Sequence, residues 1–228
     1  YEELVRRHLI YVIPQSGYYV VKRNQQEKRS EAQMIDFKSA SPDSTLFPYR
    51  DFQHCLNLAI DRYQKSLFEY GTPQGLSSLL QVVQKQLAEY QVFARIEQIM
   101  VTSGVQQALS ILTSMPFPSG KEMILIEQPS YFKFIQTLQL VGKDVIGIPR
   151  YIDGFDLDLL ESIFRQNPIK FFYTMPRLQN PLGTSLPSNQ KKAIAELAKK
   201  YNVYIVEDDY LVDLETDKKN DPIYASQN

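Results

Sequence analysis

The sequence has few of the residues that build disulfides and metal clusters. Its 228 residues include one cysteine, Cys55, and two histidines, His8 and His54. A single cysteine excludes an internal disulfide and a cysteine-rich zinc site, and two histidines are too few for a histidine metal cluster. Because cysteine-poor chains are the norm in reducing compartments, we expect a cytoplasmic protein.

Long apolar runs and an excess of charge of one sign are also missing. No apolar run approaches the roughly 18 residues that a membrane-spanning helix needs, so we expect no membrane protein. The opening residues are charged, so no signal peptide is expected. The 25 Lys and Arg residues nearly balance the 26 Asp and Glu residues, which excludes a strongly basic polyelectrolyte. With 43% hydrophobic and 22% charged residues, the composition is that of a globular chain rather than a disordered one.

The length predicts one main core with a smaller additional piece, because domains average roughly 150 residues. Residues 9–21 are expected to form a β-hairpin, since two β-prone runs flank Pro14-Gln15-Ser16-Gly17. Gly17 can adopt the positive φ that a tight turn favours. Residues 23–33 are polar and lack periodicity, which is typical of a linker.

Helices and strands are expected to alternate after the linker. Apolar residues recur at three- and four-residue steps between Phe52 and Leu67, and again after Gly75, which predicts two amphipathic helices. Short apolar runs then alternate with helical patterns. The predicted strands are 98–102, 122–127, 144–149, 169–175 and 203–207, with helices at about 105–115, 131–141, 156–166 and 188–201. This alternation predicts an α/β fold, a mostly parallel sheet with helices on both faces.

Unusual polar sequences follow four of the predicted strands. They contain Ser103-Gly104, Pro129-Ser130-Tyr131, Gln179-Asn180-Pro181 and Asp208-Asp209-Tyr210. In an open α/β sheet, ligands bind beyond the carboxyl ends of the strands. Because parallel strands end at one edge, we expect Ser103, Tyr131, Asn180 and Asp208 to cluster there. The convergence of the four sequences, rather than any one of them, predicts a binding site.

Each polar sequence also has an ordinary structural explanation. Ser103-Gly104 at a helix start offers N–H groups to a phosphate, although a plain strand-to-helix turn is simpler. The ring of Tyr131 suits a flat ligand but equally suits packing. Residues 180–183 read as a turn. Either Asp208 or Asp209 suits a cationic ring nitrogen, a helix cap or a surface position.

Taken together, the polar sequences resemble the fold-type I pyridoxal-phosphate (PLP) aminotransferases. The resemblance covers roughly residues 43–228, and the motifs occur in that family's order and spacing. They are Tyr70-Gly71-Thr72-Pro73-Gln74-Gly75, Ser103-Gly104-Val105-Gln106-Gln107-Ala108-Leu109, Pro129-Ser130-Tyr131, Gln179-Asn180-Pro181-Leu182-Gly183 and Glu207-Asp208-Asp209-Tyr210. Five motifs in one order make the resemblance highly specific.

The N-terminal residues resemble the end of a GntR-type winged helix. Tyr1-Glu2-Glu3-Leu4 is similar to the tail of its recognition helix, and Pro14-Gln15-Ser16-Gly17-Tyr18-Tyr19-Val20 is similar to its wing. The implied organisation is a winged-helix remnant at 1–22, a linker at 23–42 and an aminotransferase-like PLP-binding domain at 43–228. This is the organisation of the MocR/GabR type of bacterial transcriptional regulator.

The resemblance implies nine cofactor-binding residues. They are Tyr70, Ser103, Gly104, Val105, Gln106, Tyr131, Asn180, Asp208 and Tyr210. Asp208 matches the carboxylate that pairs with the pyridine nitrogen and keeps it protonated, so that the ring withdraws electrons from a substrate carbanion. Asn180 and Tyr210 match residues that hydrogen-bond the phenolate oxygen of the ring.

The remaining matches concern the face of the ring and its phosphate. Tyr131 matches the aromatic residue that stacks on the ring. Val105 and Gln106 match positions whose backbone N–H groups hold the phosphate, although many relatives have Ser where Val105 stands. Tyr70 matches a tyrosine that reaches the phosphate of the neighbouring subunit, which implies a homodimer with a shared site.

One departure from the family concerns the Schiff-base lysine, which lies well beyond the motif aspartate in the family. None of the lysines near the motif matches it: Lys191, Lys192, Lys199 and Lys200 precede the motif, and Lys218 and Lys219 follow it too closely in a polar turn. The arginines that grip the substrate carboxylate and the small C-terminal domain are also missing. We therefore expect a chain truncated at both ends, with no catalytic residue and no transaminase activity. The intact protein is expected to bind PLP, and this chain to bind it weakly or not at all.

Three functions remain open at this point. The first is a PLP-binding transcriptional regulator whose aminotransferase-like domain senses a small-molecule amine or amino acid, with DNA as its partner. The alternative is a PLP-dependent aminotransferase acting on an amino acid, whose hairpin is a local extension. The third is a degenerate binding module without a cofactor. The wing motif and the polar linker favour the first, although we expect this chain alone to bind DNA weakly and with a steep dependence on salt.

Overall fold

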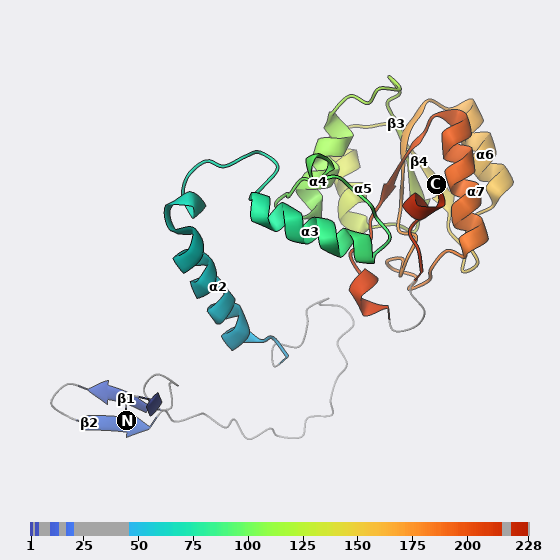
Figure 1. Cartoon of the computed structure of the whole chain (residues 1–228). Coiled ribbons are helices and arrows are strands. Elements are labelled where there is room, and N and C mark those ends of the chain that lie inside the picture. Colours follow the sequence, from blue (N-terminus) through green and yellow to red (C-terminus); the bar gives the residue numbers. More distant parts are fainter. Residues whose placement is uncertain (2, 5–9, 14–16, 21–45, 216–219, 228) are drawn as a thin grey trace, which may run out of the picture. The chain divides into compact units, whose positions relative to one another are not determined.

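The computed structural model describes residues 1, 3–4, 10–13, 17–20, 46–215 and 220–227 (Figure 1). The chain divides into two compact units, Tyr1–Leu67 and Phe68–Asn228. The predicted linker lies almost wholly outside the described residues, so the predicted boundaries at residues 22 and 42 stay predictions. No helix among the described residues is long and apolar enough to cross a membrane.

The first unit contains the predicted hairpin and the first predicted helix. Strands β1 (Ile10–Ile13) and β2 (Gly17–Val20) pair antiparallel, with Ile13 opposite Gly17. Gly17 has φ +105°, the left-handed backbone that favours glycine in a turn. Helix α2 (Tyr49–Tyr63) continues into the 3₁₀ turn Gln64–Leu67 and buries none of its side chains. The hairpin and the helix are confirmed, while the residues between β1 and β2 lie outside the description.

The second unit is the predicted alternation of helices and strands. Its helices and strands, in chain order, are α3 (Ser77–Glu89), α4 (Val105–Ser114), β3 (Met123–Gln128), α5 (Phe132–Leu140), β4 (Val145–Pro149), α6 (Leu157–Gln166), β5 (Ile169–Thr174), α7 (Ser188–Tyr201) and β6 (Tyr204–Glu207). Short 3₁₀ turns add Ile96–Gln98, Val212–Leu214 and Ile223–Gln227. The α/β prediction is confirmed.

One predicted strand, 98–102, is wrong. Ile96–Gln98 forms a 3₁₀ turn, and the residues after it are extended but belong to no sheet among the described residues. Their link to the rest of the chain is a hydrogen bond from the N–H of Val101 to the carbonyl of Gln74, at 2.8 Å. An extended segment becomes a strand only beside a second strand that pairs its backbone groups, and no described strand lies there.

Strands β3 to β6 form a parallel sheet in the order β4-β3-β5-β6. Every residue of β5 is buried. A central parallel strand is covered on both faces, which explains why its apolar residues run on without alternation. Because all the strands run the same way, their carboxyl ends lie along one edge.

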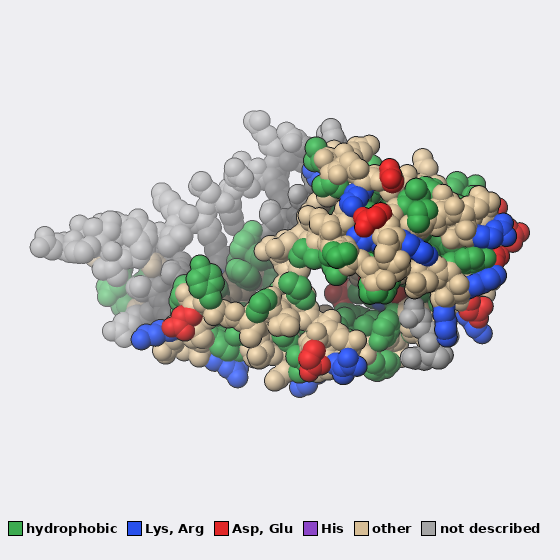
Figure 2. Space-filling view, turned by 90° about the horizontal axis from the view of Figure 1, so that it is seen from above, with side chains coloured by type: hydrophobic (Ala, Val, Ile, Leu, Met, Phe, Trp, Pro, Cys, Tyr) green, Lys and Arg blue, Asp and Glu red, His purple; other side chains and the backbone are tan. Residues whose placement is uncertain are grey.

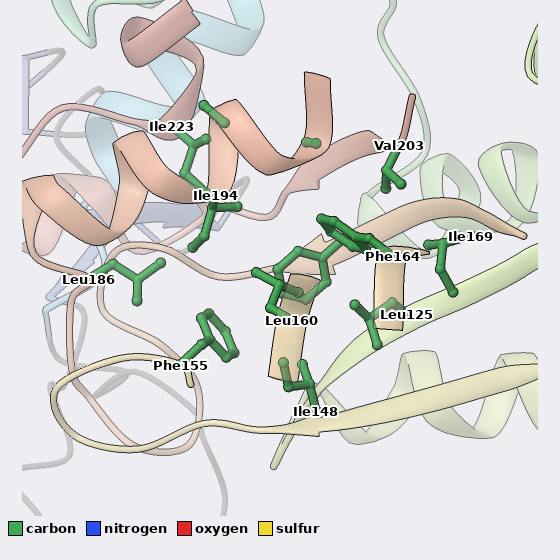
Figure 3. Packing of buried hydrophobic residues seen from close by; sticks show 13 residues of the cluster. Leu125, Ile148, Phe155, Leu160, Phe164, Ile169, Leu186, Ile194, Val203 and Ile223 are labelled. Carbon is green, nitrogen blue, oxygen red and sulfur yellow. The ribbon is translucent and has the colours of Figure 1, made fainter. Parts of the chain in front are cut away.

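Helices cover both faces of this sheet (Figure 1). Alternate residues of a strand point to opposite faces. Leu125 and Phe172 pack against α6 and α7 in the cluster shown in Figure 3. Phe171 and Tyr173 pack on the other face against residues of α4 and α5, among them Phe134. On the face seen in Figure 2, acidic and basic side chains are interspersed, in keeping with the near-zero net charge.

Phe172→Ala should test this packing. The ring is fully buried, with its centroid 5.5 Å from that of Phe155 and 6.2 Å from that of Phe164. We expect the variant to lower the free energy of unfolding by about 3–5 kcal/mol, because it leaves a cavity. Leu140→Ala, at a side chain that is 87% exposed, should change it by less than about 0.5 kcal/mol. Equal effects in urea unfolding would contradict the packing described.

Candidate functional site

The carboxyl ends of β3, β5 and β6 bring three loops together. In the sheet register Ile126 lies opposite Tyr173, and Thr174 lies opposite Glu207. The N–H of Asp208 donates to the carbonyl of Thr174 at 3.0 Å, so the pairing extends one residue beyond β6. The polar residues that follow these strands therefore start from one edge of the sheet.

Asp208 lies at this edge, directly after the outer strand β6. The hydroxyl of Tyr173 donates to a carboxylate oxygen of Asp208 at 2.6 Å. Burial raises the pKa of the Asp208 carboxyl above its ordinary value, and the hydrogen bond from Tyr173 opposes that rise. Tyr173 is fully buried, and its own pKa is strongly raised by burial and by the nearby charge of Asp208, so it stays a hydrogen-bond donor. Tyr173 is therefore a neutral partner, and the negative charge of Asp208 remains available to a cation.

The neighbouring carboxylate, Asp209, is already paired. Arg177, which is 3% exposed, donates from Nε to Asp209 at 2.8 Å and from a second nitrogen to the other oxygen of the same carboxylate. Arg177 also donates to the backbone carbonyl of Asn220 at 2.6 Å. The structure thus separates the two carboxylates that the sequence left equivalent. Asp209 has a structural ion pair, whereas Asp208 has none with the described residues.

Asn180 and Tyr210 meet at the same edge. The side-chain amide of Asn180 donates to the hydroxyl of Tyr210 at 3.1 Å. Asn180 is partly buried and Tyr210 is 58% exposed. These two residues come from the loops after β5 and β6. Together they present an amide and a phenol beside Asp208.

Tyr131 joins the group from the end of β3. It stands directly before α5 and packs against the cluster that contains Tyr173. The side-chain amide of Gln106 donates to the hydroxyl of Tyr131 at 2.9 Å. This contact ties the first turn of α4 to the sheet edge.

The start of α4 is the fourth part of the site. Gly104 precedes the helix with φ +80°, and the N–H of Ser103 donates to the side chain of Gln107 at 2.6 Å. Val105 and Gln106 occupy the first turn, where N–H groups have no acceptor within the helix. The first turn holds no acidic residue. A helix start of this kind favours an anion through its N–H groups and its dipole.

Eight of the nine predicted residues are therefore brought together or lie on the elements that meet here. Ser103 was expected to follow a strand. It follows an extended segment that pairs with no described strand. Tyr70 stands apart, with a fully exposed side chain. Tyr173 was missed by the sequence reasoning, because a tyrosine inside a continuous buried strand looks like packing. Its position at the end of that strand is the only signal that could have indicated it.

The side chains and backbone groups at this edge define which kind of ligand the site can hold. Among the described residues, no group of three or more His, Cys, Asp or Glu side chains is close enough to hold a metal ion. The site offers N–H donors for an anion, the aromatic ring of Tyr131, a carboxylate for a cation, and the Asn180–Tyr210 pair for an acceptor oxygen. A flat ring with a cationic nitrogen, a polar oxygen and a phosphate complements this set.

Comparison with known proteins agrees with this chemistry. The family profile for aminotransferase class I and II matches residues 47–223. The HTH-type transcriptional regulator YcxD of Bacillus subtilis is 54% identical over 98% of this chain and 50% of its own length. The regulator YdcR of Escherichia coli is 25% identical over 94% of this chain and 51% of its own. The chain thus spans about half the length of these relatives.

Solved structures share the fold. Pyrococcus horikoshii kynurenine aminotransferase, solved with PMP, is 27% identical and has a TM-score of 0.71. The match covers 82% of this chain and 48% of the aminotransferase. LysN of Thermus thermophilus, solved with N-(5'-phosphopyridoxyl)-L-leucine, is also 27% identical and has a TM-score of 0.67. The match covers 76% of this chain and 43% of LysN.

Both resemblances seen in the sequence are confirmed by these comparisons. The regulators YcxD and YdcR are similar to nearly the whole chain, as predicted for the MocR/GabR type. The solved aminotransferases match its α/β fold. The chain belongs to the aminotransferase class I and II family.

Proposed function

We propose that this chain binds PLP and that its aminotransferase-like domain serves as the effector sensor of a transcriptional regulator. The observation that carries the proposal is Asp208, a partly buried carboxylate whose side-chain hydrogen-bond donor Tyr173 is neutral, at the edge where α4 begins. A buried carboxylate without a cation is costly. A protonated ring nitrogen would supply that cation.

The residues present fit the cofactor. When bound, PLP supplies an electron-withdrawing ring that stabilises negative charge on an attached carbon. Asp208 holds the proton at the ring nitrogen, and Asn180 with Tyr210 orients the phenolate oxygen. The N–H groups of Val105 and Gln106, beside Ser103 and Gly104, receive the phosphate, while Tyr131 covers the ring. Tyr70 is proposed to act on the neighbouring subunit of a homodimer.

The regulatory role rests on the relatives and on the N-terminal hairpin. We propose that residues 1–22 are part of a winged helix that contacts DNA, that 23–42 link it to the sensor, and that 43–228 form the PLP-binding domain. The effector is a small amine or amino acid. The regulators YcxD and YdcR match 98% and 94% of this chain, whereas the named aminotransferases of Thermococcus litoralis and Rattus norvegicus match 77% and 87% of it. This difference favours regulation over the alternative of an amino-acid aminotransferase.

The lysines of α7 also favour sensing without a covalent link. Lys191 is 2% exposed and donates to the carbonyl of Asp221 at 2.6 Å, and Lys200 pairs with Glu161 at 2.6 Å. Lys192 and Lys199 are exposed side chains of the same helix. Lys218 and Lys219 lie outside the described residues. We therefore propose that PLP is held in this chain by non-covalent contacts.

Replacing Asp208 should test the cofactor proposal. We expect Asp208→Asn to weaken PLP binding about 10- to 100-fold, because charge-assisted hydrogen bonds contribute about 1.5–3 kcal/mol. Binding is measured by absorbance titration of the chain. Asp158→Asn, at an exposed carboxylate on α6, is the matched control and should bind like the original chain. Equal affinity of the Asp208 variant and the control would remove the proposed role.

The same variant should change how stability depends on pH. Because the folded-state pKa of Asp208 is raised above 3.8, the folded chain holds this proton more tightly than the unfolded chain. Asp208 therefore costs stability above both pKa values, and the cost fades as pH falls through the raised folded-state pKa towards 3.8. We expect Asp208→Asn to be at least as stable as the original chain at pH 7, with an advantage that shrinks on acidification.

Urea midpoints between pH 4 and pH 7 measure this difference. The buried carboxyls of Glu127 and Glu207, whose pKa values burial also raises, contribute equally to both proteins and cancel in the comparison. If the original chain were the more stable one at pH 7, and increasingly so as pH rises, Asp208 would be a stabilising structural residue instead.

A further inference from the structure

A second polar network lies on the other face of the sheet edge, centred on Glu127. This carboxylate is fully buried at the end of β3. One oxygen accepts hydrogen bonds from the hydroxyl of Thr174 at 2.5 Å and from the N–H of Met175 at 3.1 Å. The other oxygen accepts from the side-chain amide of Gln179 at 3.1 Å. Three donors therefore converge on the two oxygens of Glu127, which accepts them all.

Gln179 uses its whole side chain in the same network. Its Nε2 donates both to Glu127 and to the carbonyl of Pro129, at 2.8 Å for the second bond. Its Oε1 accepts from the N–H of Leu182 at 2.9 Å. The side chain is 1% exposed. The amide therefore clamps the loop after β5 to the end of β3.

The clamp fixes the loop that carries Asn180. The N–H of Gln179 donates to the carbonyl of Thr184 at 2.9 Å, and the N–H of Gly183 donates back to Gln179 at 2.6 Å. Leu178, just before the clamp, has φ +46°, a left-handed backbone that costs a leucine about 1–3 kcal/mol. Such a conformation persists only where the surroundings impose it. Asn180 follows directly after Gln179, so the clamp sets its position.

Arg150 supplies the opposing charge. It follows β4, is 4% exposed, and lies with its guanidinium 5.0 Å from the ring centre of Phe155. None of its three side-chain nitrogens has a hydrogen-bond partner among the described residues. Its charge lowers the pKa of the Glu127 carboxyl, against the larger effect of burial, which raises it. A buried cation without hydrogen bonds is costly. The nearby charge of Glu127 offsets only part of the effect of burial, which lowers the pKa of Arg150.

We propose that Glu127 and Gln179 are positioning residues that hold Asn180 at the PLP site. The inference rests on the proposed function for what Asn180 contacts. The clamp itself exists without any cofactor. It acts through the loop and touches no reacting atom.

Glu127→Gln separates the clamp from the rest of the network. The variant keeps one acceptor oxygen for Thr174 and Met175 but turns an NH₂ donor towards the amide of Gln179. Two donors then face each other, and the contact between positions 127 and 179 is lost. We expect hydrogen exchange of the N–H groups of Leu182 and Gly183 to rise about tenfold or more in the cofactor-free chain, since a lost buried hydrogen bond costs about 1–3 kcal/mol.

A second substitution provides a rescue. Gln179→Glu alone places two carboxylates together and should also deprotect the loop. In the double variant Glu127→Gln with Gln179→Glu, the donor and acceptor exchange places, and one amide–carboxylate bond is restored. Protection of Leu182 should return in part. A merely structural loss at either position would not be reversed by the second change.

Lys170→Met is the control for general loss of stability. Lys170 lies near the start of β5, the strand that ends at Thr174, and donates to the carbonyls of Thr113 and Met115 at 3.0 and 2.6 Å. Its replacement should destabilise the fold without selective deprotection of Leu182 and Gly183. Selective deprotection in this control, or none in Glu127→Gln, would overturn the proposed clamp.

PLP titration then tests the link to Asn180. Glu127→Gln and Asn180→Ala should each weaken PLP binding about tenfold, and the double variant should be little weaker than either, because both remove one interaction. Additive losses would overturn the positioning role. If the original chain bound no PLP, the proposed function would fail, while the exchange measurements would still decide whether the clamp exists.

Discussion

The parallel pairing of β3, β5 and β6 is the constraint on which the site depends. It aligns three strand ends so closely that the N–H of Asp208, one residue past β6, still bonds the carbonyl of Thr174 at 3.0 Å. The loops that follow these strands therefore begin at the same edge, where hydrogen bonds join residues 30 to 52 positions apart in the chain. Apolar packing on both faces maintains the alignment, and polar side chains occupy the edge where that packing ends.

Burial at this edge gives similar residues different roles. Asp209 and Asp208 are adjacent, yet one forms an ion pair with Arg177 while the other accepts a hydrogen bond from the neutral Tyr173. Glu127, on the opposite face, is satisfied by three donors. Among the described residues, Asp209 and Glu127 are thus engaged by donors of the chain, whereas no cation pairs with Asp208, and we propose that Asp208 therefore selects a cationic ligand.

The sequence predicted the elements more reliably than their contacts. β3 and β5 could be found because central strands are continuous apolar runs, and α3 to α7 because their apolar residues repeat with the helical period. The strand at 98–102 failed because a strand also needs a neighbour, which no local pattern contains. Asp208 and Asp209 could not be told apart, since the choice depends on Arg177, more than thirty positions away. Glu127 and Arg150 looked like ordinary strand and loop residues for the same reason, and Gln179 stood in a polar motif without a role of its own.

The protonation state of the bound cofactor tests the role of Asp208 most directly. Nitrogen-15 NMR of PLP labelled at the ring nitrogen reports whether that atom carries a proton. With this chain, the nitrogen should stay protonated to a higher pH than in free PLP, and Asp208→Asn should remove the difference. An identical titration of the ring nitrogen in the two proteins would contradict the account, because Asp208 would then not be the group that faces it.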